Sequence, residues 1–346
     1  MSQMMEAVMI DKERVLRISA TPVPVCRPNE AVIKVYSVGV CATDLHVYQG
    51  MQNHRIRFPI IPGHEWSGEV VSVGAEVKTF EVGDRVVGEV TVPCGVCKHC
   101  KKGNYNICPS RVECGVFGKN GAAAQYICVP VTSLHKIPPT LSFDDACLIE
   151  PSAIVYRGIE KVGLTPGDKV LVVGAGPIGL LTVAIAKVFG ASTVVLVDLQ
   201  SNRLEIGKEL GATDTINIST EDYSKRANEI TNGDLFDVII EASGSVNAVE
   251  DLFEFTAPGA RVCLLGILSE KANIDMNSII RKDVEVYGSV GCPNVWEKVI
   301  PLVEGGRIPV NKIVTHHYTL YQFEEALLQI ENRDPSIIKA IINPND

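Results

Sequence analysis

The chain has 346 residues, enough for about two domains, and 46% of them are hydrophobic and 21% charged, as is ordinary for a protein with a buried core. Its net charge is −9 and its pI is about 5.4. This acidity argues against binding to nucleic acid or to an anionic membrane surface, because both rely on Lys and Arg that neutralise phosphates.

The N-terminal sequence has no basic start followed by a long apolar run, so we predict no secretory signal and expect a cytoplasmic protein. Disulfides are rare in that compartment, where clustered cysteines are more often metal ligands or catalytic groups. The uncharged stretch 170–186 is close to the minimum length of a membrane span, but it contains glycines and a proline. We predict that it is a buried strand followed by a helix, not a membrane segment.

Residues 1–150 are predicted to be mostly short strands. Runs rich in β-branched residues and bounded by glycines occur at 31–40, 68–74 and 84–90. Turn residues are frequent between them. We therefore expect a β-rich, loop-rich first region.

Four cysteines are clustered inside this first region with the spacing C-x2-C-x2-C-x7-C. They are Cys94, Cys97, Cys100 and Cys108. Four thiolates can complete a tetrahedral site around one zinc ion, and such a filled site is structural, not catalytic. Two other interpretations are open: an iron–sulfur cluster, since Pro109 follows the last cysteine, and four free structural cysteines. His99 lies within the cluster and is interpreted as solvated.

The pattern changes near residue 165. Residues 165–198 are predicted as strand, glycine turn, helix and strand, and 201–212 as an amphipathic helix. Further buried strands are predicted at 236–244, 260–266 and 283–290. Continuous apolar strands that alternate with helices indicate a doubly wound parallel sheet, covered on both faces. The tail is predicted to hold helices at 295–304 and 320–331 and a last strand at 336–343.

The glycine turn has the pattern G-x-G-x-x-G, formed by Gly174, Gly176 and Gly179. It follows a predicted strand and begins a helix with Pro177, and such a turn lets a backbone approach a pyrophosphate. Asp198 lies 19 residues beyond Gly179, where an acid would bind an adenosine ribose. The alternative is a tight turn without a ligand.

The same acid favours NAD over NADP, because a carboxylate repels a 2′-phosphate. Arg203 complicates this choice, since an arginine can stack on adenine or bind that phosphate. We prefer the stacking or ribose-side role for Arg203. The predicted cofactor-binding residues are Gly174, Gly176, Pro177, Ile178, Gly179, Asp198 and Arg203.

Three further segments carry metal-ligand side chains: Cys41 in CATDLH, His64 in PGHEWSGE and Glu150 in LIEPS. Each alone has an ordinary explanation as a buried cysteine, a loop histidine or a helix-capping acid. Together they fit a catalytic zinc site, which uses three protein ligands and keeps one position open.

These motifs together resemble those of the zinc-containing medium-chain alcohol dehydrogenases. The resemblance covers essentially the whole chain and rests on the G-H-E motif at 63–65, the four-cysteine lobe and the G-A-G-P-I-G turn with Asp198. The chain looks closest to the polyol and threonine dehydrogenase branch, where a glutamate in I-E-P takes the third catalytic position, as Glu150 does here. The segment PGHEWSG is also similar to dehydrogenases of cyclitols and aminocyclitols.

The resemblance implies an α/β protein with a GroES-like catalytic domain at 1–152 that contains the structural zinc lobe 93–110. It also implies a Rossmann NAD-binding domain at 153–292 and a segment 293–346 that returns to the catalytic domain. Two zinc ions per chain and NAD are the implied cofactors. A homodimer or homotetramer is expected, joined through strands of the cofactor domain.

The resemblance also assigns roles to single residues. Cys41, His64 and Glu65 match the ligands of the catalytic zinc, with Glu150 bound directly or through water. Asp44 matches the acid that orients the zinc histidine, Thr43 the hydroxyl that touches the substrate oxygen, and His46 the outer end of a proton relay. The four cysteines of the cluster match the structural zinc lobe.

The expected activity is hydride transfer to NAD⁺ from a secondary alcohol of a small polyol, sugar acid or cyclitol. The alternatives are L-threonine 3-dehydrogenase and a non-catalytic nucleotide-binding protein. Polyol dehydrogenases often carry an arginine after the last Rossmann strand, but residues 287–296 contain no basic residue. Asn294 and Trp296 are candidates for lining the substrate wall there.

Overall fold

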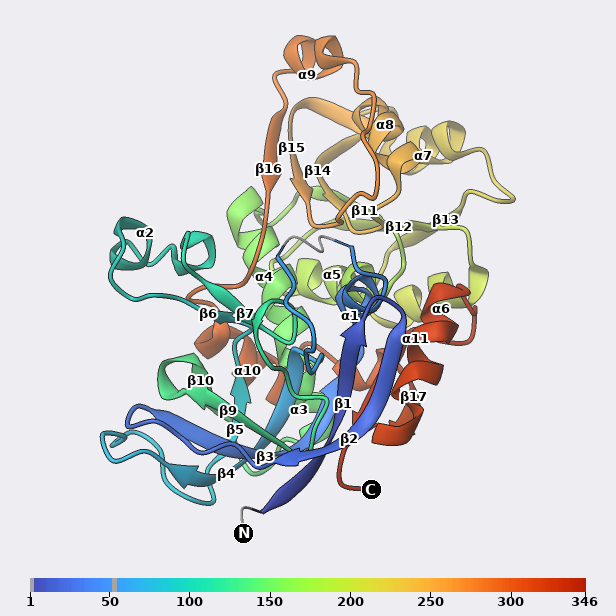
Figure 1. The fold of residues 1–346 in the computed structure, drawn as a ribbon. Helices are drawn as coiled ribbons and strands as arrows, with labels where there is room; N and C mark the ends of the chain where they lie inside the picture. The colour runs from blue at the N-terminus through green and yellow to red at the C-terminus, as the bar shows by residue number, and fades with distance from the viewer. Residues whose placement is uncertain (1–2, 52–54) are drawn as a thin grey trace. The chain divides into compact units, whose positions relative to one another are not determined.

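A computed structural model describes residues 3–51 and 55–346 of the chain (Figure 1). The chain divides into two compact units. The first comprises Met1–Glu150, Trp296–Glu304 and Val314–Asp346, and the second comprises Pro151–Val295 and Gly305–Ile313. The mixed α/β architecture agrees with the predicted fold class.

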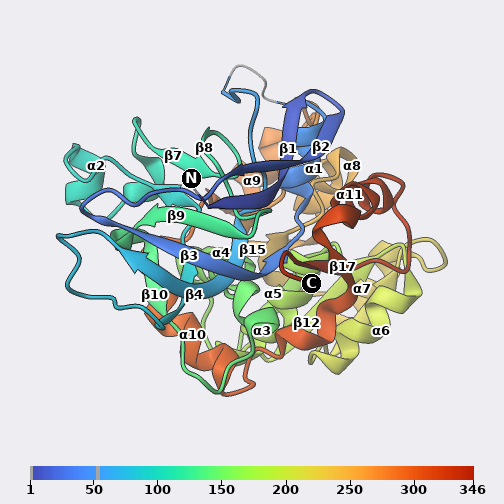
Figure 2. The same ribbon diagram turned by 60° about the horizontal axis from the view of Figure 1, so that its bottom comes forward.

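The first unit is built on a seven-stranded sheet in the order β10-β5-β4-β3-β18-β17, with β9 also paired to β3. Its strands are β3 (Glu30–Gly39), β4 (Glu65–Val73), β5 (Arg85–Gly88), β9 (Tyr126–Pro130), β10 (Leu134–Lys136), β17 (Val314–Thr319) and β18 (Lys339–Asn343). Among these strands, Figure 2 labels β10, β4, β3, β9 and β17. The central strand β3 is buried along most of its length and pairs with β4, β9 and β18. The C-terminal strands β17 and β18 thus complete a sheet begun by the N-terminal region.

Smaller elements surround this sheet. The hairpin β1–β2 (Met4–Lys12, Val15–Pro22) forms a two-stranded sheet, and β6 (Thr91–Val92), β7 (Val112–Cys114) and β8 (Gly118–Lys119) form a three-stranded one. The helices are α1 (Ala42–Tyr48), α2 (Lys98–Lys101), α3 (Phe143–Cys147), α10 (Trp296–Glu304) and α11 (Phe323–Glu331). Short 3₁₀ turns occur at Tyr105–Ile107, Val131–Ser133 and Leu320–Gln322.

The second unit is a parallel sheet in the order β13-β12-β11-β14-β15-β16 (Figure 1). The strands are β11 (Lys169–Val173), β12 (Thr193–Asp198), β13 (Asp214–Asn217), β14 (Phe236–Glu241), β15 (Thr256–Leu264) and β16 (Glu285–Gly288). This is the strand order of a dinucleotide-binding doubly wound fold, whose ligand crevice lies at the carboxyl ends of the strands. The prediction of a doubly wound parallel sheet is confirmed.

Helices connect these strands. They are α4 (Ile149–Val162), α5 (Pro177–Val188), α6 (Ser201–Glu209), α7 (Tyr223–Thr231), α8 (Val246–Asp251) and α9 (Met276–Lys282), with 3₁₀ turns at Leu252–Phe255 and Val310–Ile313. The apolar run 170–186 divides into most of β11, the glycine turn and most of α5. No helix in the described part of the chain is long and apolar enough to cross a membrane.

His135 connects β10 to α10 within the first unit. Its Nε2 lies 3.0 Å from the carboxylate of Glu89, its Nδ1 lies 3.2 Å from that of Glu297, and its ring stacks on Trp296. Burial alone would lower the pKa of His135, but hydrogen bonds and charge from the two glutamates raise it above 6.5. Trp296, a candidate for the substrate wall, is only 1% exposed because it packs in this cluster.

This cluster predicts a pH-dependent contribution to stability. A raised histidine pKa stabilises the fold fully below the unfolded value of about 6.5, and the effect is lost as pH rises through the folded pKa. We expect His135→Gln to lower the free energy of unfolding by about 1–3 kcal/mol near pH 6, and by less at pH 9. Urea unfolding across this pH range measures the difference, with His316→Gln as the control; a difference that grows with pH would contradict the assignment.

Candidate active site and metal centres

Asp44 links the start of α1 to the loop before β4. It is completely buried; one carboxylate oxygen accepts the N–H of Cys41 at 2.9 Å and the other accepts that of Gly63 at 2.9 Å. Burial alone would raise the pKa of Asp44, but the His64 imidazole and these two N–H groups lower it. Asp44 is therefore an ionised, buried anchor that brings Cys41 close to His64.

Gly63 allows the chain to turn immediately before the next two ligand candidates. Its φ is +90°, and a Cβ there would lie 2.8 Å from the backbone nitrogen of Ala123, so only glycine fits without displacement. His64 and Glu65 follow at the start of β4 and are 5% and 2% exposed. Ligand atoms of Cys41, His64 and Glu65 all lie within 4.8 Å of one another. The structure thus brings together three residues from two distant segments.

The electrostatics of this group favour a cation. His64 Nδ1 lies 3.4 Å from Asp44 Oδ1. Burial alone would lower the pKa of His64, but the Asp44 carboxylate and then the Cys41 sulfur raise it well above 6.5. Neither His64 Nδ1 nor Glu65 Oε2, both buried, has a hydrogen bond of acceptable geometry within the described residues, although Glu65 Oε2 forms an ion pair with the ammonium of Lys339. One sulfur, one imidazole and one carboxylate in so compact a group fit a catalytic zinc site with an open position.

Glu150 is buried in the first turn of α4, but it does not belong to the group whose ligand atoms lie within 4.8 Å. Burial raises the pKa of Glu150 to about 8; the charge of His64 opposes the shift and that of Glu65 adds to it. Glu150 therefore interacts electrostatically with the group. Of the two acids, only Glu65 belongs to the compact group, and zinc ligation by either acid stays a prediction.

Thr43 and His46, the residues predicted to relay the proton, both lie on the short helix α1. Thr43 Oγ1 lies 3.7 Å from Cys41 Sγ, in the first turn of α1. His46 lies one turn further along and is half-buried. Burial lowers the pKa of His46, with Asp44 opposing the shift. A neutral imidazole is therefore available at neutral pH, as a proton acceptor requires.

Lys339 is a site residue that the sequence analysis missed. It begins β18, is 2% exposed, forms an ion pair with Glu65 and donates to the carbonyl of Val40 at 2.9 Å. The buried Lys339 ammonium offsets the charge of the Glu65 carboxylate and holds that carboxylate in its orientation. The sequence did offer one indication: Lys339 is the single lysine in the apolar run 336–343. A lysine in a buried strand is expected to have a charged partner.

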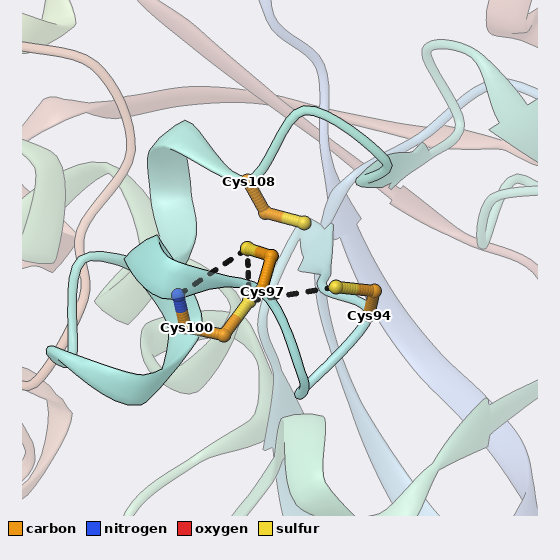
Figure 3. Close-up of side chains that lie close together, drawn as sticks. All are labelled: Cys94, Cys97, Cys100 and Cys108. Atoms are coloured by element: carbon orange, nitrogen blue, oxygen red, sulfur yellow. Dashed lines mark hydrogen bonds between the residues drawn. The ribbon is translucent and has the colours of Figure 1, made fainter.

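The four-cysteine lobe forms the second candidate metal centre (Figure 3). Ligand atoms of all four cysteines lie within 4.8 Å of one another, with Cys97 Sγ 3.4 Å and Cys94 Sγ 3.9 Å from Cys100 Sγ. Four sulfurs around one zinc at about 2.3 Å would be about 3.8 Å apart, so the observed spacing fits a single ion. Thiolates that bind different irons of a cluster would lie farther apart, and the iron–sulfur interpretation fits less well.

Local backbone geometry produces this arrangement. Gly95 and Gly103 have φ of +72° and +77°, which let the chain reverse twice within the lobe. Cys97 is the N-cap of α2, and its sulfur accepts the N–H of Cys100 at 3.5 Å. Backbone N–H groups of Val96 and Cys97 lower the pKa of Cys94 to about 6, which favours the thiolate form that binds metal.

The glycine turn of the second unit connects β11 to α5. Gly174 has a φ of +98°, and a Cβ on Gly179 would lie 1.7 Å from the carbonyl of Gly174, so both positions require glycine. Gly176 is the N-cap of α5, before Pro177 and Ile178, and nothing lies within 4 Å of where its Cβ would be. This open space at a helix N-terminus fits a pyrophosphate.

Asp198 lies at the end of β12, beside this turn. One of its carboxylate oxygens accepts the N–H of Ala175 at 2.7 Å and the other accepts that of Gln200 at 2.9 Å. The structure thus brings the acid to the glycine turn, as an adenosine ribose would require. Arg203 is half-buried on α6, the helix that follows β12.

Comparison with known proteins finds a family match in each half of the chain. Residues 27–139 match the family model of the alcohol dehydrogenase GroES-like domain, and residues 177–305 match that of zinc-binding dehydrogenase. Sorbitol dehydrogenase of Bacillus subtilis (strain 168) is 35% identical over 99% of this chain and 98% of its own. L-Threonine 3-dehydrogenase of Chromobacterium violaceum is 34% identical over 90% of this chain and 91% of its own.

A solved structure has a similar fold over nearly the whole chain. A zinc-binding dehydrogenase from Sinorhizobium meliloti 1021, bound to NADP, has a TM-score of 0.92 and 29% identity, covering 99% of this chain and all of its own. Identity of 35% along nearly the whole chain is decisive for family membership. The chain belongs to the zinc-containing medium-chain alcohol dehydrogenases, in the branch that includes polyol and threonine dehydrogenases.

Proposed function

We propose that the protein is an NAD- and zinc-dependent dehydrogenase that oxidises a secondary alcohol of a small polyol, sugar acid or cyclitol. The observation that carries the proposal is the compact group formed by Cys41, His64 and Glu65. Residues 1–152 would form the catalytic domain and 153–292 the NAD-binding domain. Residues 293–346 would return to the catalytic domain apart from 293–295 and Gly305–Ile313, which belong to the second compact unit.

Zinc held by this group, with Glu150 as a direct or water-mediated ligand, would act as a Lewis acid that lowers the pKa of a substrate hydroxyl. NAD⁺ would supply the nicotinamide ring that accepts hydride. A secondary alcohol and NAD⁺ become a ketone, NADH and one proton, so the chain must carry that proton away. Thr43 can accept it and pass its own proton on, and His46 suits the outer end of the relay because its neutral form is available.

The substrate is tested with a panel of polyols, inositols, aldonates and L-threonine, read as NADH absorbance. Turnover of a polyol, aldonate or inositol well above that of threonine is expected. Threonine is the second candidate, because the threonine dehydrogenase relative is almost as similar as the sorbitol dehydrogenase. A clear preference for threonine would make L-threonine 3-dehydrogenase the first candidate function. No turnover of any alcohol would contradict the proposal.

Asp198 is proposed to select NAD. The solved relative bound to NADP means that the family fold alone does not choose the cofactor. Asp198→Ala is expected to lower the NAD to NADP ratio of kcat/KM about tenfold or more, because a ribose hydrogen bond to a charged group is lost and the repulsion of a 2′-phosphate disappears. Steady-state kinetics with each cofactor measure this. Asp234→Ala removes an exposed carboxylate elsewhere and is the control; an unchanged ratio in Asp198→Ala would refute the selector role.

We also propose that the protein is cytoplasmic and forms a homodimer or homotetramer. Reduced cysteines, which two thiolate metal sites need, persist in that compartment. Strand β16 is at the edge of the parallel sheet, with Val286 42% exposed and Val290 52% exposed nearby. Such an edge can pair with its copy about a two-fold axis.

Light scattering is expected to give two or four times the chain mass of 37.4 kDa. A charge at Val286 would be buried in the paired edge, so Val286→Lys should shift the protein toward monomer. Val71→Lys, at an exposed valine of the other unit, is the control. A wild-type protein that is monomeric at micromolar concentration would contradict the assembly.

A further inference from the structure

Glu241 is a buried acid that the proposed chemistry does not use. It is the last residue of β14 and is 0% exposed. Its Oε1 accepts the N–H groups of Ser243 and Gly244 at 2.7 Å and 2.9 Å, and the hydroxyl of Ser243 at 2.5 Å. One carboxylate oxygen thus receives three donors from the loop that follows its own strand. Burying a carboxylate is costly, and three donors at one oxygen offset that cost.

The backbone of the same residue ties neighbouring strands together. The carbonyl of Glu241 accepts the N–H groups of Leu265 and Gly266, at 2.9 Å and 3.2 Å, from the segment after β15. On the other side, the N–H of Ala242 donates to the carbonyl of Val173 in β11 at 2.9 Å. The carboxyl ends of β11, β14 and β15 are therefore joined by the backbone of Glu241 and Ala242.

Close packing restricts the backbone conformation of the loop 242–244 that follows Glu241. A Cβ on Gly266 would lie 2.4 Å from Glu241 Oε2, and a Cβ on Gly174 would lie 2.9 Å from Ser243. Gly244 has a φ of +63°, which favours glycine. The loop that Glu241 holds therefore packs directly against the glycine turn. Glu241 Oε2 itself has no hydrogen bond to any described residue.

The position of this loop in the sheet suggests its purpose. β11 and β14 are neighbours at the point where the strand order reverses, and dinucleotides bind across that point. The half formed by β11–β13 takes the adenosine side, and the half that begins with β14 takes the nicotinamide side. Residues 242–244 are the first backbone segment on the nicotinamide side.

We propose that Glu241 is a positioning residue that keeps the 242–244 loop in the shape needed for the nicotinamide half of the dinucleotide. This inference rests on the proposed function, because it assumes that the second unit binds NAD. Glu241 does not touch the reacting atoms; it acts through the backbone of Ser243 and Gly244. Its loss should therefore weaken binding of the whole dinucleotide, but not of its adenosine half.

The test compares the Kd of NADH, from protein fluorescence quenching, with the Kd of AMP, from calorimetry, in the zinc-loaded full chain. Glu241→Ala frees the loop, so the binding-competent fraction falls and the Kd of NADH should rise about tenfold or more. The Kd of AMP should change less than about twofold, because AMP occupies only the half of the sheet that Glu241 does not hold. Glu241→Gln keeps an acceptor at Oε1 and should restore the Kd of NADH to within about threefold of wild type.

The outcomes separate the two ideas. If the wild-type protein binds neither NADH nor AMP, the proposed function itself fails. If NADH binds and Glu241→Ala weakens NADH and AMP equally, or weakens neither, the positioning role is overturned while the function stands. Should Glu241→Ala not fold, Ser243→Ala decides, because it removes only the hydroxyl, which donates to Glu241 Oε1 and accepts the N–H of Ser245. A rise of about two- to fivefold in the Kd of NADH alone supports the role, and no rise overturns it.

Discussion

Replacing Cys41 by serine is expected to lower kcat at least about a thousandfold, because the variant loses the several kcal/mol that a Lewis acid supplies to the transition state. The compact ligand group would keep only His64 and Glu65, and a serine hydroxyl is a poor replacement for a thiolate on zinc. The zinc content should fall from about two to about one per chain. The Kd of NADH should stay within about twofold of wild type, since the glycine turn and Asp198 belong to the other unit.

Metal analysis, NADH-linked turnover and fluorescence binding measure these three quantities. Cys26→Ser is the matched control, because Cys26 is half-buried, contacts Ser72 and belongs to neither ligand group. The control should keep both zinc ions and normal turnover. Retention of two zinc ions and full turnover by the Cys41 variant would refute the catalytic assignment.

The second large effect is expected in the four-cysteine lobe, where Cys97→Ser should remove the other zinc and unfold the lobe locally. α2 has no buried residue, and of the four cysteines only Cys108 is fully buried, so the lobe has little core of its own. Structural zinc contributes about 10–16 kcal/mol of binding free energy in small zinc-finger peptides, which is more than such a lobe can replace.

Hydrogen exchange followed by mass spectrometry should show loss of protection across residues 94–108, with the parallel sheet of the second unit unchanged. His99→Ala is the matched control, because His99 lies within the lobe but outside the group of four sulfurs. The control should retain two zinc ions and full protection. A protected lobe in the Cys97 variant would mean that metal does not hold it together.

Motifs with local spacing were predictable from the sequence. The cysteine cluster and the glycine turn lie within short segments, so their spacing alone implies the geometry that the structure shows. Asp198 was also predictable, because a parallel neighbour strand brings its carboxyl end to the same edge as the turn. The Glu65 carboxylate in the compact group followed only from the resemblance to the family.

Residues whose roles depend on distant pairing were not predictable. Lys339 contacts Glu65 only because β18 inserts beside β3, a pairing between segments about three hundred residues apart. The role of Glu241 was not predictable either. It ends an apolar strand, and nothing in the sequence indicates that its carboxylate accepts hydrogen bonds from the following loop. Likewise, the pattern I-E-P could not reveal that Glu150 lies outside the compact group.

The central claim, that one zinc ion is held by Cys41, His64 and a carboxylate, is tested most directly by zinc X-ray absorption on Cys97→Ser protein, in which the lobe site is removed. The claim predicts a single sulfur at about 2.3 Å and two or three nitrogen or oxygen ligands at about 2.0–2.2 Å. A zinc shell without sulfur, or with four sulfurs, would contradict it.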